Sequence, residues 1–389
     1  RAGAELGGME LLDNPIREYA WGSHTAIATV QGRAVPTERP EAELWMGAHP
    51  DDPSRLRGDG TLAAAIAADP VGLLGERVTA EYGARLPFLV KLLAADEPLS
   101  LQAHPDPDQA RSGFEAEEAA GIAPEDPRRN YADPFHKPEL ICAVTPFEAL
   151  CGFRSASGAL AVLDALGLDS FAGALGAGGV RGAVEWLFGL DQPGLAGLSG
   201  DIACAAGKAE AGWAGEIAAD LGERYPGDPG VALSLLLNPV RLAPGEAMFL
   251  PAGCPHGYLR GVGIEVMASS DNVIRGGLTR KRVDVGELLR ILRFDAGPLP
   301  VSEPVEDGPG VLTWRPPVRE FALTRAELTG EPVTLPGAGP RILFCLSGNL
   351  TADDGAGPQP LPAGESAFVR AGRRTTLAGT GIAFTATTG

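Results

Sequence analysis

Four polar side chains in three short motifs are suited to bind a divalent metal ion together. PLSLQAHPD carries Gln102 and His104, which share one face if this segment is a strand, because side chains alternate along a strand. FHKPEL carries Glu139, and LPAGCPHGYL carries His256. Two imidazoles, one amide oxygen and one carboxylate form a mixed ligand set that suits zinc or another borderline ion. With a single anionic ligand the centre would keep a net positive charge and act as a Lewis acid.

The spacing around His256 supports this interpretation. The segment from Gly245 to His256 reads G-x5-P-x-G-x2-H, which is a strand-length run followed by a turn rich in proline and glycine. A lone histidine in a turn is more often satisfied by the local backbone. Here the spacing matches the second half of the signature of cupin barrels, which favours a metal ligand.

Seven motifs in order resemble those of the type I phosphomannose isomerases. They are NPIREYAWGS, ELWMGAHP, PFLVKLL, PLSLQAHPD, FHKPEL, LPAGCPHGYL and MASSDNVIRGGLTRK, which ends at Lys281. The resemblance covers most of residues 10–290 and, more weakly, the tail. It implies an isomerase that interconverts mannose 6-phosphate and fructose 6-phosphate. It also implies one Zn²⁺ per chain, held by Gln102, His104, Glu139 and His256.

Such an isomerisation passes through an enediolate, so the site needs a base, a group that stabilises negative charge and an anchor for the sugar phosphate. The candidates for binding phosphate or hydroxyl groups are Lys91, Ser100, Lys137 and Lys281. Lys91 lies inside the apolar run FLVKLL, where a buried ammonium group without a partner would be costly. The alternative interpretation is that Lys91 lies on an edge strand and that its side chain reaches water.

The segment GIEVMASSDNVIRGGLTRK carries the remaining candidates. The resemblance places Arg275 near the reacting carbons, where its permanent charge would stabilise the enediolate, and places Glu265 and Asp271 in the same cleft. Glu265 and Asp271 are therefore acid/base candidates. The alternative for each is a structural ion pair with Arg275 or a lysine. The base that takes the proton stays open among Glu265, a histidine and metal-bound water.

Two further positions in these motifs concern the same cleft. Arg280 stands where the family commonly has proline, and we expect it to face solvent rather than to join the phosphate site. His49, in ELWMGAHP, is not a metal ligand in the family, and a structural or supporting role is expected for it.

Three units are predicted to position these residues. Residues 9–154 and 233–292 read as strands and form the metal-binding cupin domain, and the Ala/Leu-rich residues 155–232 form a helical insertion between its two parts. Residues 293–389 repeat the glycine spacing, but Thr375 stands where His256 would fall. The predicted fold is therefore mainly β with a helical insertion, built on two cupin-type jelly-roll barrels, of which the second lacks metal ligands.

The composition limits the partners and the location. A formal net charge of −18 argues against general affinity for nucleic acid or anionic membranes. No apolar run reaches membrane-spanning length, and the five cysteines form no CxxC pair. We therefore expect a cytoplasmic protein, either a monomer or a weak homo-oligomer, whose partner is a small sugar phosphate.

Two rival functions share parts of this pattern. A metal-dependent cupin oxygenase would use iron and dioxygen, usually with more histidine ligands. A non-catalytic sugar-phosphate-binding cupin protein would keep the barrel without needing Arg275. The barrel alone does not separate these functions, since a fold does not imply an activity.

Overall fold

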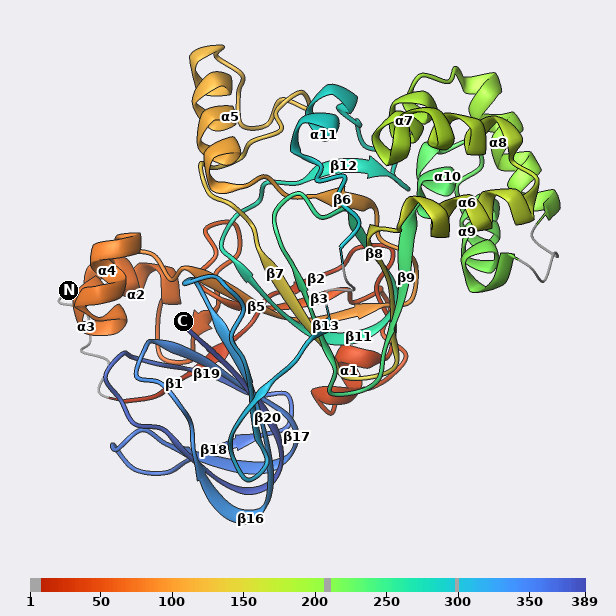
Figure 1. Cartoon of the computed structure of the whole chain (residues 1–389). Coiled ribbons are helices and arrows are strands. Elements are labelled where there is room, and N and C mark those ends of the chain that lie inside the picture. Colours follow the sequence, from red (N-terminus) through yellow and green to blue (C-terminus); the bar gives the residue numbers. More distant parts are fainter. Residues whose placement is uncertain (1–7, 206–210, 298–300) are drawn as a thin grey trace.

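Two antiparallel sheets with surrounding helices make the protein mainly β (Figure 1). The computed structural model describes residues 8–205, 211–297 and 301–389. The first sheet runs in the order β13-β10-β7-β11-β5-β3-β2, and β6, β8, β9 and β12 join it through β11. Its strands are β2 (Ile16–Arg17), β3 (Glu43–Gly47), β5 (Phe88–Ala95), β6 (Leu101–Ala103), β7 (Glu139–Ala143), β8 (Phe147–Phe153), β9 (Leu237–Leu242), β10 (Ala247–Leu250), β11 (His256–Ala268), β12 (Ile274–Gly277) and β13 (Val301–Ser302).

Strand β11 connects the two parts of this sheet because it bends at Gly261. The residues before Gly261 pair with β6 and β8, and Gly261 and the residues after it pair with β5 and β7. Gly261 has a φ of 124°, and a Cβ there would lie 2.7 Å from the carbonyl oxygen of Pro146. Only glycine fits this close approach without strain. His256 therefore lies in the part of β11 that pairs with β6 and β8, and Glu265 lies in the part that pairs with β5 and β7.

The second sheet comes mostly from the C-terminal part of the chain. Its order is β14-β15-β16-β20-β17-β19-β1-β4, and β18 pairs with β17. Its strands are β1 (Glu10–Asp13), β4 (Arg55–Leu56), β14 (Val305–Gly308), β15 (Val311–Trp314), β16 (Ala322–Thr334), β17 (Arg341–Asp353), β18 (Gln359–Pro362), β19 (Ser366–Val369) and β20 (Thr376–Thr387).

The sheets exchange short strands across the domain boundaries expected from the sequence. Strands β1 and β4, expected in the metal-binding unit, pair in the second sheet, whereas β13 pairs with β10 in the first. The periodicity of so short a strand shows which face is apolar, but it carries no information about the sheet edge that the strand joins. The division into three domains therefore stays a prediction.

The helical insertion forms a separate lobe beside the first sheet (Figure 1). Its helices are α6 (Ala156–Leu166), α7 (Asp169–Phe188), α8 (Gln192–Ala205), α9 (Gly212–Arg224) and α10 (Pro229–Ser234). Ser155 caps α6 and Asp228 caps α10, each by accepting a backbone N–H of the first turn. Residues 206–210 of the predicted insertion, and 298–300 of the predicted C-terminal domain, lie outside the described residues.

The remaining helices lie elsewhere on the molecule. They are α1 (Ala26–Val30), α2 (Leu62–Ala68), α3 (Pro70–Leu74), α4 (Glu76–Tyr82), α5 (Pro107–Ala119) and α11 (Val285–Ile291). Within the described ranges, every helix is too short or too polar to cross a bilayer.

The lobe supports the strands that carry the candidate site. Leu101 and Ala103 of β6 and Ile274 of β12 share a buried core with the helices of the lobe, including Leu233 of α10. Because side chains alternate along a strand, the residues between them, Gln102 among them, lie on the opposite face. The insertion thus packs behind β6 and β12 and leaves their polar face free.

Candidate active site and metal centre

His104, Glu139 and His256 meet at one buried point. His104 follows β6, Glu139 begins β7 and His256 begins β11. His104 Nε2 lies 3.3 Å from Glu139 Oε1, and His256 Nε2 lies 3.3 Å from Glu139 Oε2. One ligand atom from each residue lies within 4.8 Å of the other two, which is a spacing that one ion can bridge.

The hydrogen bonds of the two rings leave the correct nitrogens free for a metal. His104 Nδ1 lies 2.7 Å from the carbonyl oxygen of Asn272, and His256 Nδ1 lies 3.0 Å from that of Cys254. A carbonyl oxygen only accepts, so each Nδ1 carries the hydrogen and each Nε2 offers a lone pair. His104 Nε2 and Glu139 Oε2 are buried without a hydrogen-bond partner in the described residues, and a cation would satisfy both.

Gln102 completes the predicted set. Its amide nitrogen lies 3.4 Å from His256 Nε2, and β6 pairs Gln102 directly with His256. A half-turn of the amide would place Oε1 at the same point, since the two amide atoms occupy nearly equivalent positions. The four residues therefore fit a metal ion with mixed nitrogen and oxygen ligands.

The charges at this point also suit a metal. Burial lowers the pKa of His104 to about 4, so its imidazole is neutral at neutral pH, as a metal ligand must be. Burial would raise the pKa of Glu139, but the pKa lies well below the usual range, and the charge of Lys137 acts in that direction. Glu139 is therefore a carboxylate.

A cavity of about 690 Å³ lies in front of the buried histidines. It is lined by all the predicted site residues except His104 and His256, which are only 2% and 1% exposed. Predicted ligands, acid/base candidates and substrate-binding candidates thus line one cavity, although they come from distant segments of the sequence.

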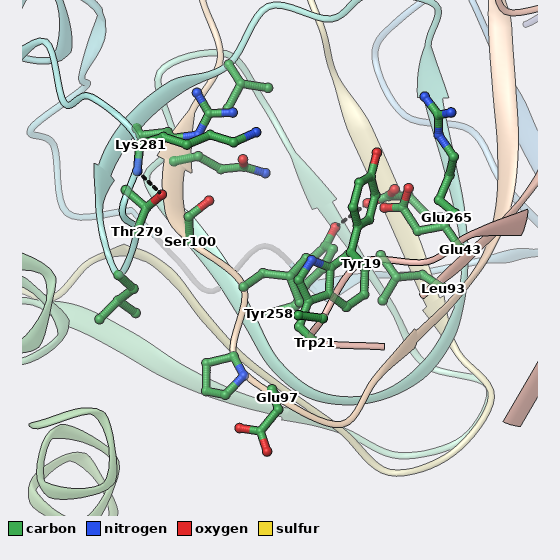
Figure 2. A pocket seen from close by; sticks show the side chains of 18 of the residues that line it. Tyr19, Trp21, Glu43, Leu93, Glu97, Ser100, Tyr258, Glu265, Thr279 and Lys281 are labelled. Carbon is green, nitrogen blue, oxygen red and sulfur yellow. Dashed lines mark hydrogen bonds between the residues drawn. The ribbon is translucent and has the colours of Figure 1, made fainter. Parts of the chain in front are cut away.

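One end of the cavity holds a network of carboxylates around Lys91. Lys91 Nζ lies 3.3 Å from Glu43 Oε1 and 3.3 Å from Glu265 Oε2. Tyr258 donates its hydroxyl to Glu265 Oε1 at 2.8 Å, and Trp45 Nε1 donates to Glu43 Oε2 at 2.7 Å. Figure 2 shows Glu43 and Glu265 on one side of the pocket, and Tyr258 nearer its middle.

Burial and pairing set the charges of this network. Burial would lower the pKa of Lys91, but the charges of Glu43 and Glu265 outweigh burial and raise it. Burial raises the pKa of Glu265, and Lys91 offsets part of that rise. Lys91 does not reach water from an edge strand, since β5 lies between β3 and β11 and the residue is 7% exposed.

The opposite end of the cavity gathers cations without carboxylate partners. The Arg275 guanidinium and the Lys281 ammonium have no hydrogen bond or ion pair with any described residue, and the charge of Arg275 lowers the pKa of Lys281. Thr279 Oγ1 accepts the backbone N–H of Lys281 at 3.1 Å, and Figure 2 shows Ser100, Thr279 and Lys281 side by side. In a protein with a net charge of −18, such a cluster favours an anionic ligand.

Arg275 belongs to the cationic end and is also adjacent to a predicted metal ligand. Strand β12 pairs it with Gln102 on β6, so the guanidinium comes from a strand next to a predicted ligand. Arg280 is exposed, as expected, and it also lines the cavity.

Lys137 and Asp271 complete the set from the sequence. Lys137 Nζ lies 3.3 Å from Glu139 Oε1, so this lysine is paired with a predicted ligand. Asp271 pairs with His49 Nε2 at 3.3 Å, rather than with Arg275 or a lysine. Glu265 does pair with a lysine, Lys91, and this ion pair was the structural role considered as the alternative for Glu265.

Three residues of this site were not predicted from the sequence. Glu43, Trp45 and Tyr258 lie in the motifs ELWMGAHP and LPAGCPHGYL, and each hydrogen-bonds within the network around Lys91. The alternation of Glu43 and Trp45 along a strand was the only available signal. It indicates a shared face, but not that this face meets Lys91.

Comparisons with known proteins agree with this geometry. The family described as phosphomannose isomerase type I, catalytic domain, matches residues 9–156. Mannose-6-phosphate isomerase of Escherichia coli is 39% identical, over 93% of this chain and 95% of the relative. That of Rattus norvegicus is 32% identical, over 93% of each.

Solved structures are similar over nearly the whole chain. A mannose 6-phosphate isomerase bound with zinc and yttrium has a TM-score of 0.91 and 37% identity, covering 98% of this chain and 99% of that one. A single-residue mutant of phosphomannose isomerase from Salmonella typhimurium gives the same TM-score, identity and coverage.

Proposed function

The chain belongs to the type I phosphomannose isomerase family, and we propose how its cavity residues divide the work of that isomerisation. It is an aldose–ketose isomerase that interconverts mannose 6-phosphate and fructose 6-phosphate, and its cofactor is zinc. This assignment of roles is supported by the way in which the residues are arranged around one cavity. A set of metal-ligating atoms lies between an end with unpaired cations and an end with paired carboxylates.

The proposed zinc ligands are Gln102, His104, Glu139 and His256, with one Zn²⁺ per chain. The unsatisfied buried atoms of His104 and Glu139 support this assignment. When bound there, zinc polarises the oxygens on the reacting carbons of the sugar. Neither function weighed against the isomerase, a cupin oxygenase or a non-catalytic sugar-phosphate-binding protein, matches the relatives in activity.

The substrate-binding residues fall into two groups. Ser100 and Lys281 are proposed to bind the phosphate, since the Lys281 ammonium has no carboxylate partner in the described residues. Lys91 and Lys137 are proposed to bind sugar hydroxyls, because their charges are already shared with Glu265 and Glu139. This arrangement holds the sugar across the metal centre with its phosphate at the cationic end.

Arg275 is proposed to stabilise the enediolate. Its guanidinium is half-buried and next to a predicted metal ligand, and no carboxylate within the described ranges pairs with it. A permanent cation fixed beside a developing negative charge stabilises the transition state more than the ground state.

Glu265 and Asp271 are proposed to move protons. In the aldose-to-ketose direction a proton leaves carbon 2 and a proton is delivered to carbon 1, while the hydroxyl proton passes between the two oxygens. Lys91 and Tyr258 hold Glu265 in place, and Asp271 lies on the cavity wall.

The finer architecture is proposed in the same way. The two antiparallel sheets support the proposal of two cupin-type barrels. The buried Thr375 stands where the repeated motif would carry a histidine, which supports the proposal that the second barrel binds no metal. The domain limits 9–154 with 233–292, 155–232 and 293–389 go with this proposal. We also propose that the net charge of −18 excludes a nucleic-acid partner. Cytoplasmic residence is proposed because the five cysteines are free, which suits a reducing compartment, and a monomer or weak homo-oligomer is proposed with it.

A metal-reconstitution assay tests the function. Protein stripped with a chelator and verified as metal-free is expected to lose isomerisation of mannose 6-phosphate, and one equivalent of Zn²⁺ is expected to restore it. The oxygenase rival predicts oxygen uptake on the same sample. Turnover at the original rate without metal would remove the metal from the mechanism.

A further inference from the structure

A buried histidine contacts Asp271, the more exposed of the two acid/base candidates that line the cavity. His49 is 2% exposed, and its ring packs edge-on against Trp45 with the ring centroids 4.9 Å apart. His49 Nε2 lies 3.3 Å from Asp271 Oδ2. The side chain of Asp271 is 39% exposed and lines the cavity. A rigidly packed ring therefore holds a carboxylate that the substrate can reach.

The hydrogen bonds of His49 determine which nitrogen carries the proton. The backbone N–H of Asp51 donates to His49 Nδ1 at 3.3 Å, so Nδ1 is an acceptor. In a neutral ring the hydrogen then sits on Nε2, which donates it to Asp271. Burial lowers the pKa of His49 despite the opposing charges of Asp271 and Asp51, and Lys91 and Lys137 lower it further. The ring is therefore a neutral donor at neutral pH.

The backbone of Asp271 is fixed independently of its side chain. Its N–H donates to Asp133 Oδ2 at 2.8 Å, in the loop before β7. The carbonyl of the next residue, Asn272, accepts from His104 Nδ1 at 2.7 Å, so the same segment orients a proposed zinc ligand. With the backbone held at these points, the contact with His49 determines where the carboxylate of Asp271 lies.

The two acid/base candidates differ in how many of their oxygens are free. Both oxygens of Glu265 are engaged, by Lys91 and Tyr258, and its side chain is 4% exposed. Asp271 uses Oδ2 for His49, whereas its Oδ1 has no hydrogen bond to the described part of the chain. With one oxygen free, Asp271 can exchange a proton directly with a sugar in the cavity.

We propose that His49 is a positioning residue for the isomerisation. By donating Nε2–H to Asp271 Oδ2, it holds the carboxylate in one orientation and leaves Oδ1 free to exchange a proton with the sugar. The inference rests on the role proposed above for Asp271 in proton transfer.

Paired substitutions at His49 test the donor in the zinc-loaded enzyme. His49→Leu removes the donor while keeping an apolar group against Trp45, and it is expected to lower kcat by about 10- to 100-fold with KM changed by less than about twofold. His49→Gln keeps a neutral N–H donor at a similar reach and is expected to retain most of kcat. If His49→Leu does not fold, His49→Asn replaces it, because the shorter amide does not reach Asp271.

A double-mutant cycle separates positioning from a structural role. In an Asp271→Asn background, adding His49→Leu is expected to lower kcat by no more than about twofold, because the group that His49 positions is already disabled. The same fold loss in both backgrounds would overturn the proposal. A His49→Gln enzyme as slow as His49→Leu, at equal zinc content and thermal midpoint, would do so too.

The same cycle distinguishes this inference from the proposed function. If Asp271→Asn alone keeps the wild-type kcat, the role of Asp271 is wrong and the positioning proposal fails with it, while zinc-dependent isomerisation stands. If Asp271→Asn is slow and the effects of the two single changes multiply, only the positioning proposal fails.

Discussion

Glu265 illustrates how burial and pairing act on a single residue. It is 3% exposed, and burial raises its pKa above the usual glutamate value, whereas Lys91 acts in the opposite direction. A carboxyl group poised in this way takes up a proton more readily than a surface glutamate. The hydroxyl of Tyr258 keeps it oriented.

The pH dependence of kcat tests this residue. If ionised Glu265 accepts the proton, activity falls as pH falls through its raised pKa, so the acid limb lies above the ordinary value of 4.5. Glu265→Gln is expected to lower kcat by about 10²-fold or more and to remove that limb. Steady-state kinetics between pH 4.5 and 8 measure both effects. A Glu265→Gln enzyme with an unchanged limb would assign the limb to another group.

At the scale of elements, the helical lobe holds the turn that precedes the proposed phosphate-binding residue Lys281. Asp228 caps α10 by accepting the N–H of Gly230 at 2.7 Å. The same carboxylate accepts the N–H groups of Leu278 at 2.7 Å and Thr279 at 3.2 Å, just before Lys281. Leu278 has a φ of 53°, which a non-glycine residue adopts only when its surroundings hold it there. The insertion therefore fixes the turn that presents the proposed phosphate-binding residues.

Substitution of Asp228 tests this link. Asp228→Ala is expected to raise KM for mannose 6-phosphate by about tenfold, with a smaller change in kcat, because it loosens the turn and not the metal centre. Asp228→Asn keeps an acceptor oxygen and is the matched control. Steady-state kinetics and zinc content are measured together. Equal KM values for the wild-type and Asp228→Ala enzymes would show that the turn is held by other contacts.

At the scale of the whole molecule, one metal would join elements that the sequence separates widely. The proposed ligands lie on or just after β6 and at the start of β7 and β11, and the helical insertion lies between β8 and β9 along the chain. A ligand that binds only the folded state stabilises it in proportion to its affinity and concentration. Zinc should therefore act as a cross-link within the first sheet as well as a cofactor.

Thermal unfolding with and without zinc tests the cross-link. At a free Zn²⁺ concentration about 100 times the dissociation constant, the folded state gains about 2.7 kcal/mol. The midpoint of the metal-free protein is expected to lie lower by several degrees. His104→Ala should have a lower midpoint that zinc no longer shifts. A midpoint independent of zinc in the wild type would mean that the ion is not bound between these strands.

The sequence by itself determined the family, the activity, the cofactor and the mainly β fold, because motifs record local chemistry and the alternation of side chains. Gln102 and His104 were predicted to share one face of a strand; Gln102 lies on β6 opposite His256, and His104 directly follows that strand. Only the tertiary structure decided which charges meet. Glu43 reaches Lys91, His49 reaches Asp271, and β1 joins the C-terminal sheet. These contacts depend on strand register and on bends such as that at Gly261, and no local pattern encodes the partner of a residue in a distant segment.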